Sequence, residues 1–208
     1  MIAIIDYGMG NLRSVEKGIA RTGFPTVVTS DAKVIHGARG VVLPGVGAFG
    51  ACMENLRSRG LIEPIRSLVG SGKPFLGICL GLQLLFEESE EFGPIRGLGI
   101  LPGRVVRFGE AALGGRKIPQ IGWNSLRIRR PVAELEGIDQ GAYVYFVHSY
   151  YVVPAEDDLT VASSEYGVEF TAAIARQNVF ACQFHPEKSQ TVGLKILENF
   201  VGRVRASS

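Results

Sequence analysis

The first half of the chain alternates short apolar, often β-branched runs with segments in which apolar residues recur at helical spacing. Runs suited to buried strands cover residues 2–7, 26–30, 40–43 and 74–78. Segments suited to helices cover residues 12–19, 49–59 and 80–88. Parallel strands need crossover connections, which helices usually supply. The alternation therefore predicts a mainly parallel sheet flanked by helices.

The second half has a different pattern. Strand-like runs follow one another with short loops over residues 105–108, 121–128, 142–153, 159–166, 171–176 and 179–184. Short loops join antiparallel strands, so we expect antiparallel additions to the sheet. A last helix is predicted over residues 191–204. Because the 208 residues contain no repeat or linker, we expect one domain, 1–208.

Composition and charge exclude several classes of protein. No apolar run approaches the roughly 18 residues of a membrane span. A net charge of +2 provides no single-sign surface for nucleic acid. Three scattered cysteines without a C-x-x-C pair indicate neither disulfides nor a zinc site, and no signal peptide precedes the first strand. We therefore expect a cytoplasmic protein without a metal or cofactor. Glycine is the unusual count, at 27 residues.

Cys79 is the cysteine with the most informative context, because it stands in G-I-C-L-G between a predicted strand and a predicted helix. Glycines two residues before and after a nucleophile make room for neighbouring backbone, as in a nucleophile elbow. A following helix N-terminus favours the thiolate. A plain tight turn could give the same five residues. Cys52 and Cys182 are expected to be small buried residues, since Cys52 lies on an apolar helix face and Cys182 points away from His185.

His185 has the context of a general base. In H-P-E, the side chains of His185 and Glu187 point to the same side of an extended segment, so the carboxylate can hold one ring nitrogen while the other faces a nucleophile. Strand alternation also turns Gln183 to the side of His185. H-P-E alone is a weak signal, but with G-I-C-L-G it forms a coherent Cys–His–Glu set. His148 is expected to be a packed core residue and His36 an exposed loop residue.

A glycine-rich turn, P-G-V-G-A-F-G at residues 44–50, follows the third predicted strand and precedes a helix. Its backbone N–H groups could cradle a phosphate. However, it lacks the Lys-Ser/Thr of a P-loop and the order of a G-x-G-x-x-G fingerprint. An oxyanion hole is the better interpretation, because such a turn should lie beside the Cys79 strand and add an N–H to that of Leu80.

These elements, in this order and spacing, resemble the class I (triad-type) glutamine amidotransferases, which hydrolyse the side-chain amide of glutamine with a Cys–His–Glu triad. The similarity covers the whole chain. It rests on D-Y-G-M-G-N (6–11), L-P-G-V-G-A-F (43–49), G-I-C-L-G-L-Q-L-L-F (77–86), I-P-Q-I-G-W-N (118–124), F-V-H-S-Y-Y (146–151) and F-H-P-E-K-S (184–189). The resemblance implies a flavodoxin-like α/β fold.

The resemblance also implies a role for individual residues. Cys79 would be the nucleophile, His185 the acid–base group and Glu187 its orienting carboxylate. The oxyanion hole would be formed near Val46, Gly47 and Leu80. The substrate glutamine would lie against Gly47, Leu80, Gln83, Ser149 and Tyr150. From the residues alone, Gln83 would be a solvated helix position and Tyr150 a core aromatic residue.

Within the family, the motifs are similar to those of glutaminase subunits that pass ammonia through a tunnel to a separate, barrel-shaped cyclase subunit. In that heterodimer the ammonia serves to form imidazole glycerol phosphate in histidine biosynthesis. The implied interface residues are Asn11, Trp123, Tyr145 and Lys188, although a core position explains Trp123 equally well. A glutaminase of another pathway, a non-catalytic regulatory module on the same fold and a partner-independent cysteine hydrolase stay open as alternatives.

Overall fold

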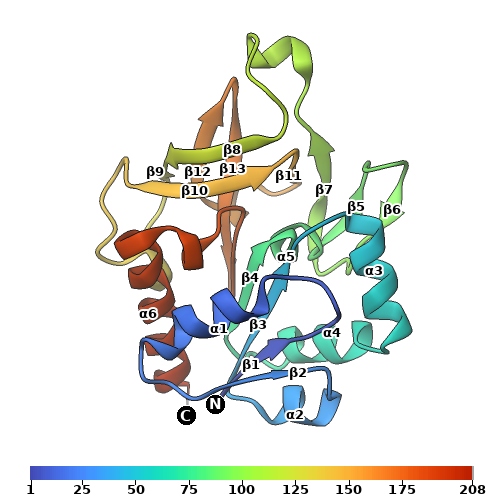
Figure 1. Ribbon diagram of the computed structural model, residues 1–208, viewed down its shortest axis with the longest axis vertical. Helices are drawn as coiled ribbons and strands as arrows, with labels where there is room; N and C mark the ends of the chain where they lie inside the picture. The colour runs from blue at the N-terminus through green and yellow to red at the C-terminus, as the bar shows by residue number, and fades with distance from the viewer. Residues whose placement is uncertain (208) are drawn as a thin grey trace.

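A computed structural model describes residues 1–207 of the chain, which form a central sheet of eight strands in the order β2-β1-β3-β4-β14-β13-β12-β9 (Figure 1). From β2 to β14, neighbouring strands are parallel, and from β14 to β9 they are antiparallel. The parallel strands are β1 (Ile2–Ile5), β2 (Thr26–Thr29), β3 (Gly40–Gly45), β4 (Phe75–Cys79) and β14 (Val179–Cys182). The others are β9 (Arg127–Ile128), β12 (Thr160–Tyr166) and β13 (Val168–Arg176).

Helices cover both faces of this sheet and create two hydrophobic cores. One core contains residues of α1 (Leu12–Ala20) and α6 (Gln190–Ala206). The other contains residues of α2 (Ala32–Gly37), α3 (Phe49–Ser58) and α4 (Ile62–Gly70). Successive side chains of β1 alternate between the cores, because side chains of a strand point to opposite faces of its sheet. Ile2 and Ile4 belong to the first core, and Ala3 and Ile5 to the second.

Two smaller sheets stand at the carboxyl end of the parallel strands. One has the order β11-β7-β5-β6 and consists of β5 (Phe86–Ser89), β6 (Ile95–Arg96), β7 (Leu101–Arg107) and β11 (Tyr150–Pro154). The other pairs β8 (Gln120–Ser125) with β10 (Tyr143–His148) and lies across the top of β4 in Figure 1. The remaining elements are short: α5 (Leu80–Gln83), η1 (Glu110–Leu113), η2 (Ala133–Leu135), η3 (Asp157–Leu159) and η4 (Pro186–Lys188).

The predicted class of fold is confirmed: a mainly parallel sheet flanked by helices, with antiparallel strands in the second half. The helix predicted over residues 80–88 is wrong, since α5 ends at Gln83 and β5 begins at Phe86. The carbonyls of Leu84 and Leu85 accept hydrogen bonds from residues 98–101 instead of continuing a helix. Helices α2 and α4 were not predicted. Strand β14 was expected among the antiparallel additions, but it also joins β4 in parallel.

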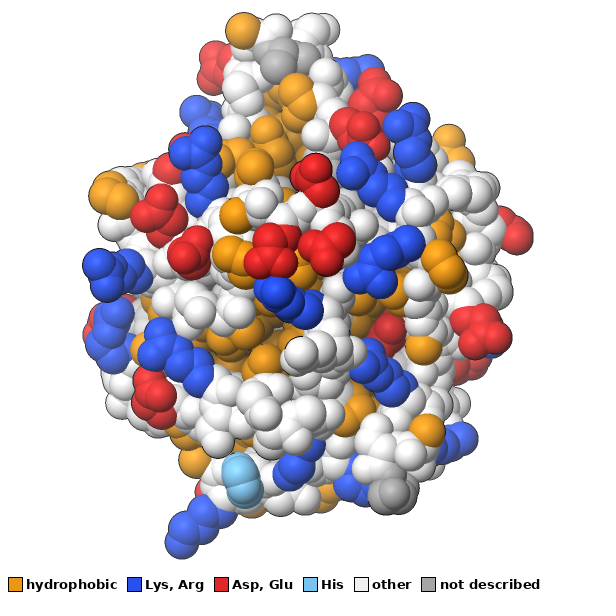
Figure 2. Space-filling model, turned by 180° about the vertical axis from the view of Figure 1, so that it is seen from behind, with side chains coloured by type: hydrophobic (Ala, Val, Ile, Leu, Met, Phe, Trp, Pro, Cys, Tyr) orange, Lys and Arg blue, Asp and Glu red, His pale blue; other side chains and the backbone are white. Residues whose placement is uncertain are grey.

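The surface carries acidic and basic side chains side by side. Figure 2 shows this mixture on the face opposite to that of Figure 1, as expected from a net charge of +2. Within residues 1–207, no helix has the length and apolar character needed to cross a membrane.

Candidate active site

Cys79 lies at the junction of β4 and α5, at the carboxyl end of the central sheet. Its backbone has φ 55° and ψ −110°, a conformation that is strained for a residue other than glycine. A Cβ at Gly77 would lie 2.9 Å from Cβ of Ala181 and 3.0 Å from the carbonyl oxygen of Gly81. Glycine at position 77 therefore lets the turn pack against β14, while the Cys79 side chain lines a pocket.

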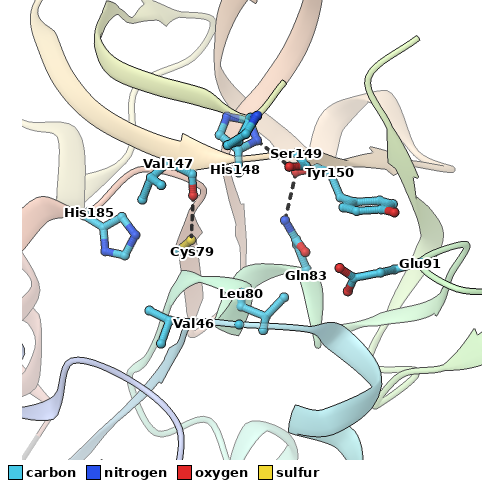
Figure 3. A pocket seen from close by; sticks show the side chains of 12 residues that line it. Val46, Cys79, Leu80, Gln83, Glu91, Val147, His148, Ser149, Tyr150 and His185 are labelled. Carbon is cyan, nitrogen blue, oxygen red and sulfur yellow. Dashed lines mark hydrogen bonds between the residues drawn. The ribbon is translucent and has the colours of Figure 1, made fainter. Parts of the chain in front are cut away.

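His185 and Glu187 reach Cys79 because β14 pairs with β4. The backbone N–H of His185 donates to the carbonyl of Tyr145 in β10 at 2.9 Å, which fixes the strand end. Nδ1 of His185 donates to Oε1 of Glu187 at 2.8 Å, and both side chains are buried. In Figure 3 the edge of the His185 ring faces the sulfur of Cys79. The structure thus brings the three predicted triad residues together.

The triad holds two buried polar atoms without a hydrogen-bond partner, Nε2 of His185 and Oε2 of Glu187. Such atoms are rare in folded proteins and mark groups held ready for another partner. Burial lowers the pKa of His185, but Cys79 and Glu187 outweigh burial and raise that pKa to about 10. Its surroundings therefore favour the protonated form of the ring beside the sulfur. Its Nε2 proton is available for transfer to a bound molecule.

Two buried carboxamides connect the far side of the pocket to the sulfur. Nε2 of Gln83 donates to the carbonyl of Tyr150 at 2.9 Å and to Oε1 of Gln183 at 3.0 Å. Nε2 of Gln183 lies 3.7 Å from Sγ of Cys79 and donates to it. Gln83 is therefore buried, and the solvated position that its residue type alone suggested is wrong.

The glycine-rich turn stands next to Cys79, because Gly45 of β3 pairs in register with Cys79 of β4. Two buried side chains donate hydrogen bonds to backbone carbonyls of the turn. The hydroxyl of Tyr7 donates to the carbonyl of Pro44 at 2.8 Å, and the thiol of Cys52 donates to the carbonyl of Val46 at 3.6 Å. The three predicted oxyanion residues, Val46, Gly47 and Leu80, all line the same pocket as Cys79.

This pocket has a volume of about 270 Å³, which suits a small molecule. Its walls include every residue that the resemblance placed against glutamine, namely Gly47, Leu80, Gln83, Ser149 and Tyr150. Tyr150 is accordingly a wall of the pocket and not a core aromatic residue. Ser149 and Tyr150 lie on one side of the cavity, and Cys79 and His185 lie on the other (Figure 3).

Glu91 is a pocket residue that the sequence did not reveal. It belongs to the acidic run E-E-S-E-E, which has the composition of an ordinary solvated turn. The turn between β5 and β6 brings it to the pocket, where its Oε2 accepts a hydrogen bond from the backbone N–H of Phe49 at 2.5 Å. In Figure 3 its carboxylate stands opposite the side chain of Gln83. Glu91 thus gives one end of the cavity a negative charge.

His148 is packed and hydrogen-bonded, as predicted, and it also lines the pocket. Its Nδ1 donates to the carbonyl of Tyr150 at 2.9 Å, and its Nε2 lies 3.0 Å from the side-chain carboxamide of Gln120. Burial lowers its pKa to about 4, so the ring is neutral at physiological pH. His36 is exposed, although it lies in α2 and not in a loop. Within residues 1–207, no cluster of potential ligands is suited to a metal ion.

Three of the four predicted interface residues form a group on β8, β10 and η4. Trp123 and Tyr145 face each other across the ribbon, with ring centroids 6.1 Å apart, and the ammonium of Lys188 lies 5.8 Å from the Tyr145 ring. The side chain of Trp123 is 45 % exposed, which excludes a core position. Asn11 lies one residue before α1, a helix that contacts η4.

The sequence model of the family described as "Glutamine amidotransferase class-I" matches residues 3–204. The chain therefore belongs to the class I glutamine amidotransferase family. Its fold agrees with a crystal structure of a glutamine amidotransferase, at a TM-score of 0.75 and 19 % identity, covering 99 % of this chain and 100 % of that one.

Curated relatives narrow the identification. The chain is 58 % identical to imidazole glycerol phosphate synthase subunit HisH of Syntrophotalea carbinolica over 203 residues, which cover 96 % of this chain and 98 % of the relative. It is 54 % identical to the subunit of the same name from Geobacter metallireducens over 202 residues, which cover 96 % of each chain. The predicted family is confirmed.

Proposed function

We propose that this protein is the glutaminase subunit of imidazole glycerol phosphate synthase, acting in histidine biosynthesis in the cytoplasm. The observation that carries the proposal is that Cys79 and His185 line one pocket, with Glu187 hydrogen-bonded to His185, in a chain that is 58 % identical to a HisH subunit. Burial and the hydrogen bond to Glu187 hold the ring of His185 in one orientation in the pocket that Cys79 also lines.

Charged and polar side chains of the pocket bind the amino-acid head of glutamine. The carboxylate of Glu91 is the complement of the α-ammonium of an amino acid, and the oxygen of Gln83 faces the same space (Figure 3). Both N–H groups of Gln83 are used within the protein, so only its oxygen is left to accept from the substrate. Ser149 and Tyr150 then bound the rest of the amino-acid head.

Hydrolysis proceeds in two halves. The thiolate of Cys79 attacks the side-chain carbonyl carbon of glutamine, and the oxygen takes up the negative charge beside Val46, Gly47 and Leu80. His185 gives its Nε2 proton to the amide nitrogen, which leaves as ammonia, and a γ-glutamyl thioester remains. Neutral His185 then accepts a proton from water, the resulting hydroxide attacks the thioester, and glutamate leaves as the thiolate forms again. Glu187 keeps the ring in one orientation throughout.

The partner is a barrel-shaped cyclase subunit, which forms a heterodimer with this chain and receives the ammonia through a tunnel. Ammonia released into water would be protonated and lost, so the pocket needs a covering surface. The partner would supply this cover by docking on the outer face of β8 and β10. This face carries the side chains of Ile121, Trp123, Tyr143 and Tyr145. Val147 of the same ribbon lines the pocket, which places this apolar face at the entrance of the site. Asn11 and Lys188 complete the proposed contact.

Co-expression with candidate synthase subunits tests the proposal. Glutamate release is measured with each partner and its nucleotide substrate, for wild type and for Cys79→Ala. We expect stimulation by the cyclase of histidine biosynthesis and loss of activity in Cys79→Ala. Stimulation by the synthase of another pathway alone would overturn the assignment. Equal rates for wild type and Cys79→Ala would show that the fold serves as a binding module.

A further inference from the structure

Gln183 occupies an unusual position for a side chain that the mechanism above does not use. It is fully buried on β14's extension, two residues before His185, and its amide nitrogen lies 3.7 Å from Sγ of Cys79. The sulfur also lies 3.9 Å from the carbonyl oxygen of Val147. That carbonyl can accept a hydrogen bond from a thiol, but it has no donor for a thiolate.

The carbonyl of Tyr150 determines which atom of each carboxamide is the nitrogen and which is the oxygen. The carbonyl of Tyr150 can only accept, so Gln83 must present an N–H to it, at 2.9 Å. The second N–H of the same Gln83 nitrogen points to Gln183 at 3.0 Å, so Gln183 must present its oxygen there. The nitrogen of Gln183 is then left to face the sulfur. No rotation of either carboxamide by 180° keeps all three contacts.

We propose that Gln183 is a further catalytic residue, which donates a hydrogen bond from its carboxamide to the Cys79 thiolate, with Gln83 as the positioning residue that fixes its direction. The inference rests on the proposed role of Cys79 as nucleophile and not on the pathway that the glutaminase serves. A hydrogen bond to a charged acceptor stabilises it more than a bond to a neutral one. Gln183 therefore favours the thiolate over the thiol.

The carboxamide of Gln183 stabilises the thiolate in a way that His185 does not. His185 gives up its proton during formation of the thioester, so its charge at the sulfur changes within each turnover. The carboxamide does not titrate and remains a donor at every step. It stabilises the thiolate both as the attacking group and as the group that leaves when water cleaves the thioester. The same chain of amides joins the sulfur to Tyr150, at the wall that holds the substrate.

The test is the pH dependence of Cys79 alkylation by iodoacetamide in the intact chain, with Cys79→Ala as the blank for Cys52 and Cys182. Gln183→Met keeps the length of the side chain and removes the donor. We expect its alkylation midpoint to move upward by about one pH unit, and kcat for glutamine to fall about tenfold with KM little changed. Gln120→Met is the matched control, because Gln120 is also a buried glutamine but contacts His148. Its midpoint should equal that of wild type.

Gln183→Glu provides a second variant of the same shape. Its carboxylate still accepts from Gln83 but places an acceptor against the sulfur, so the midpoint should rise at least as far as in Gln183→Met. If both variants fold and keep the wild-type midpoint, Gln183 only fills space and the inference is wrong. If neither variant folds, Gln83→Met decides the question, since loss of the positioning contact should also raise the midpoint. Failure of the proposed function would appear separately, as absence of glutamate release by wild type with the cyclase.

Discussion

Gly81 packs directly against the carbonyl oxygen of Leu43, so closely that a Cβ at position 81 would overlap this oxygen. The contact fixes the first turn of α5 against β3 and so holds Cys79 beside the glycine-rich turn. The neighbouring atom is backbone in the middle of a parallel sheet, which cannot move aside as the end of a flexible side chain can.

We therefore expect Gly81→Ala to lower the free energy of unfolding by about 3 kcal/mol, as overpacking of a rigid core does. Urea unfolding followed by circular dichroism measures the change. Gly202→Ala in α6 is the matched control, because a Cβ there meets nothing within 4 Å. It should leave stability unchanged or raise it by about 1 kcal/mol, through helix propensity. Equal stability of wild type and Gly81→Ala would contradict the close contact.

Glu187→Gln tests the hydrogen bond that orients His185. The amide keeps the size of the side chain, but it no longer supplies the charge that holds the imidazolium at 2.8 Å. We expect the rate of glutamate release with the cyclase to fall at least about a hundredfold. Without the carboxylate, nothing fixes the orientation and the tautomer of the His185 ring. Circular dichroism should show an unchanged fold. Retention of more than half of the wild-type rate would exclude an orienting role for Glu187.

Glu91→Gln tests recognition of the α-ammonium of glutamine. The amide oxygen can still accept from the backbone N–H of Phe49, so helix α3 should keep its start. Loss of the negative charge should raise KM for glutamine about tenfold and change kcat little, because the contact is present in the bound and reacting states alike. Glu90→Gln is the control, since the neighbouring Glu90 does not line the pocket. An unchanged KM would remove Glu91 from the substrate site.

The neutral state of His148 predicts a dependence of stability on pH. Burial lowers the pKa of His148 to about 4 in the folded protein, whereas an unfolded chain has the ordinary value near 6.5. Between these values the unfolded state binds more protons, so the contribution is complete above pH 6.5 and is lost as the pH falls toward 4. The loss amounts to about 3 kcal/mol.

Urea unfolding at a series of pH values, for wild type and His148→Gln, isolates this contribution. The carboxyl groups titrate alike in both proteins, so the difference between the two curves belongs to His148. The difference should shrink steadily as the pH falls from 6.5 to 4. Parallel curves over that interval would mean that His148 is charged in the folded protein.

Trp123→Ala tests the proposed contact with the cyclase. Because Trp123 is 45 % exposed and its ring packs edge-on against Tyr145 at the surface, its removal should leave the melting temperature of the isolated chain nearly unchanged. Affinity for the cyclase should fall by about 2 kcal/mol, roughly thirtyfold in Kd, as for an aromatic anchor. Val153→Ala, which truncates an exposed residue of β11, is the control for calorimetry. If both variants bind equally well, β8 and β10 do not form the contact.

Local motifs explain why part of the site was predictable from the sequence. The flanking glycines point to Cys79, and the spacing of His185 and Glu187 points to a paired base and carboxylate. The extended segment expected for H-P-E is wrong, however, since η4 begins at Pro186 and this helical turn brings Oε1 of Glu187 to Nδ1 of His185. The roles of Gln83 and Gln183 depend on a contact between residues 100 positions apart, which no local pattern contains. Glu91 was missed for the same reason, since an acidic turn looks alike whether it faces water or a pocket.

The errors in the fold also have a physical cause. The run Leu84–Phe86 is apolar enough for a buried helix or a buried strand, and only its hydrogen bonds with residues 98–101 decide between them. Strand β14 was assigned to the antiparallel half because its neighbour in sequence is β13. Its second partner, β4, lies about 100 residues earlier in the chain. The local sequence pattern of β14 does not indicate this pairing.

The position of β14 between β4 and β13 sets the order in which activity can arise during synthesis. Cys79 leaves the ribosome 104 residues before Gln183, with the base and its carboxylate later still. Until β14 inserts beside β4, a nascent chain carries a cysteine with neither its proton donor nor its amide contact. A translation product interrupted before β14 therefore lacks the assembled pocket in which we propose that glutamine is hydrolysed.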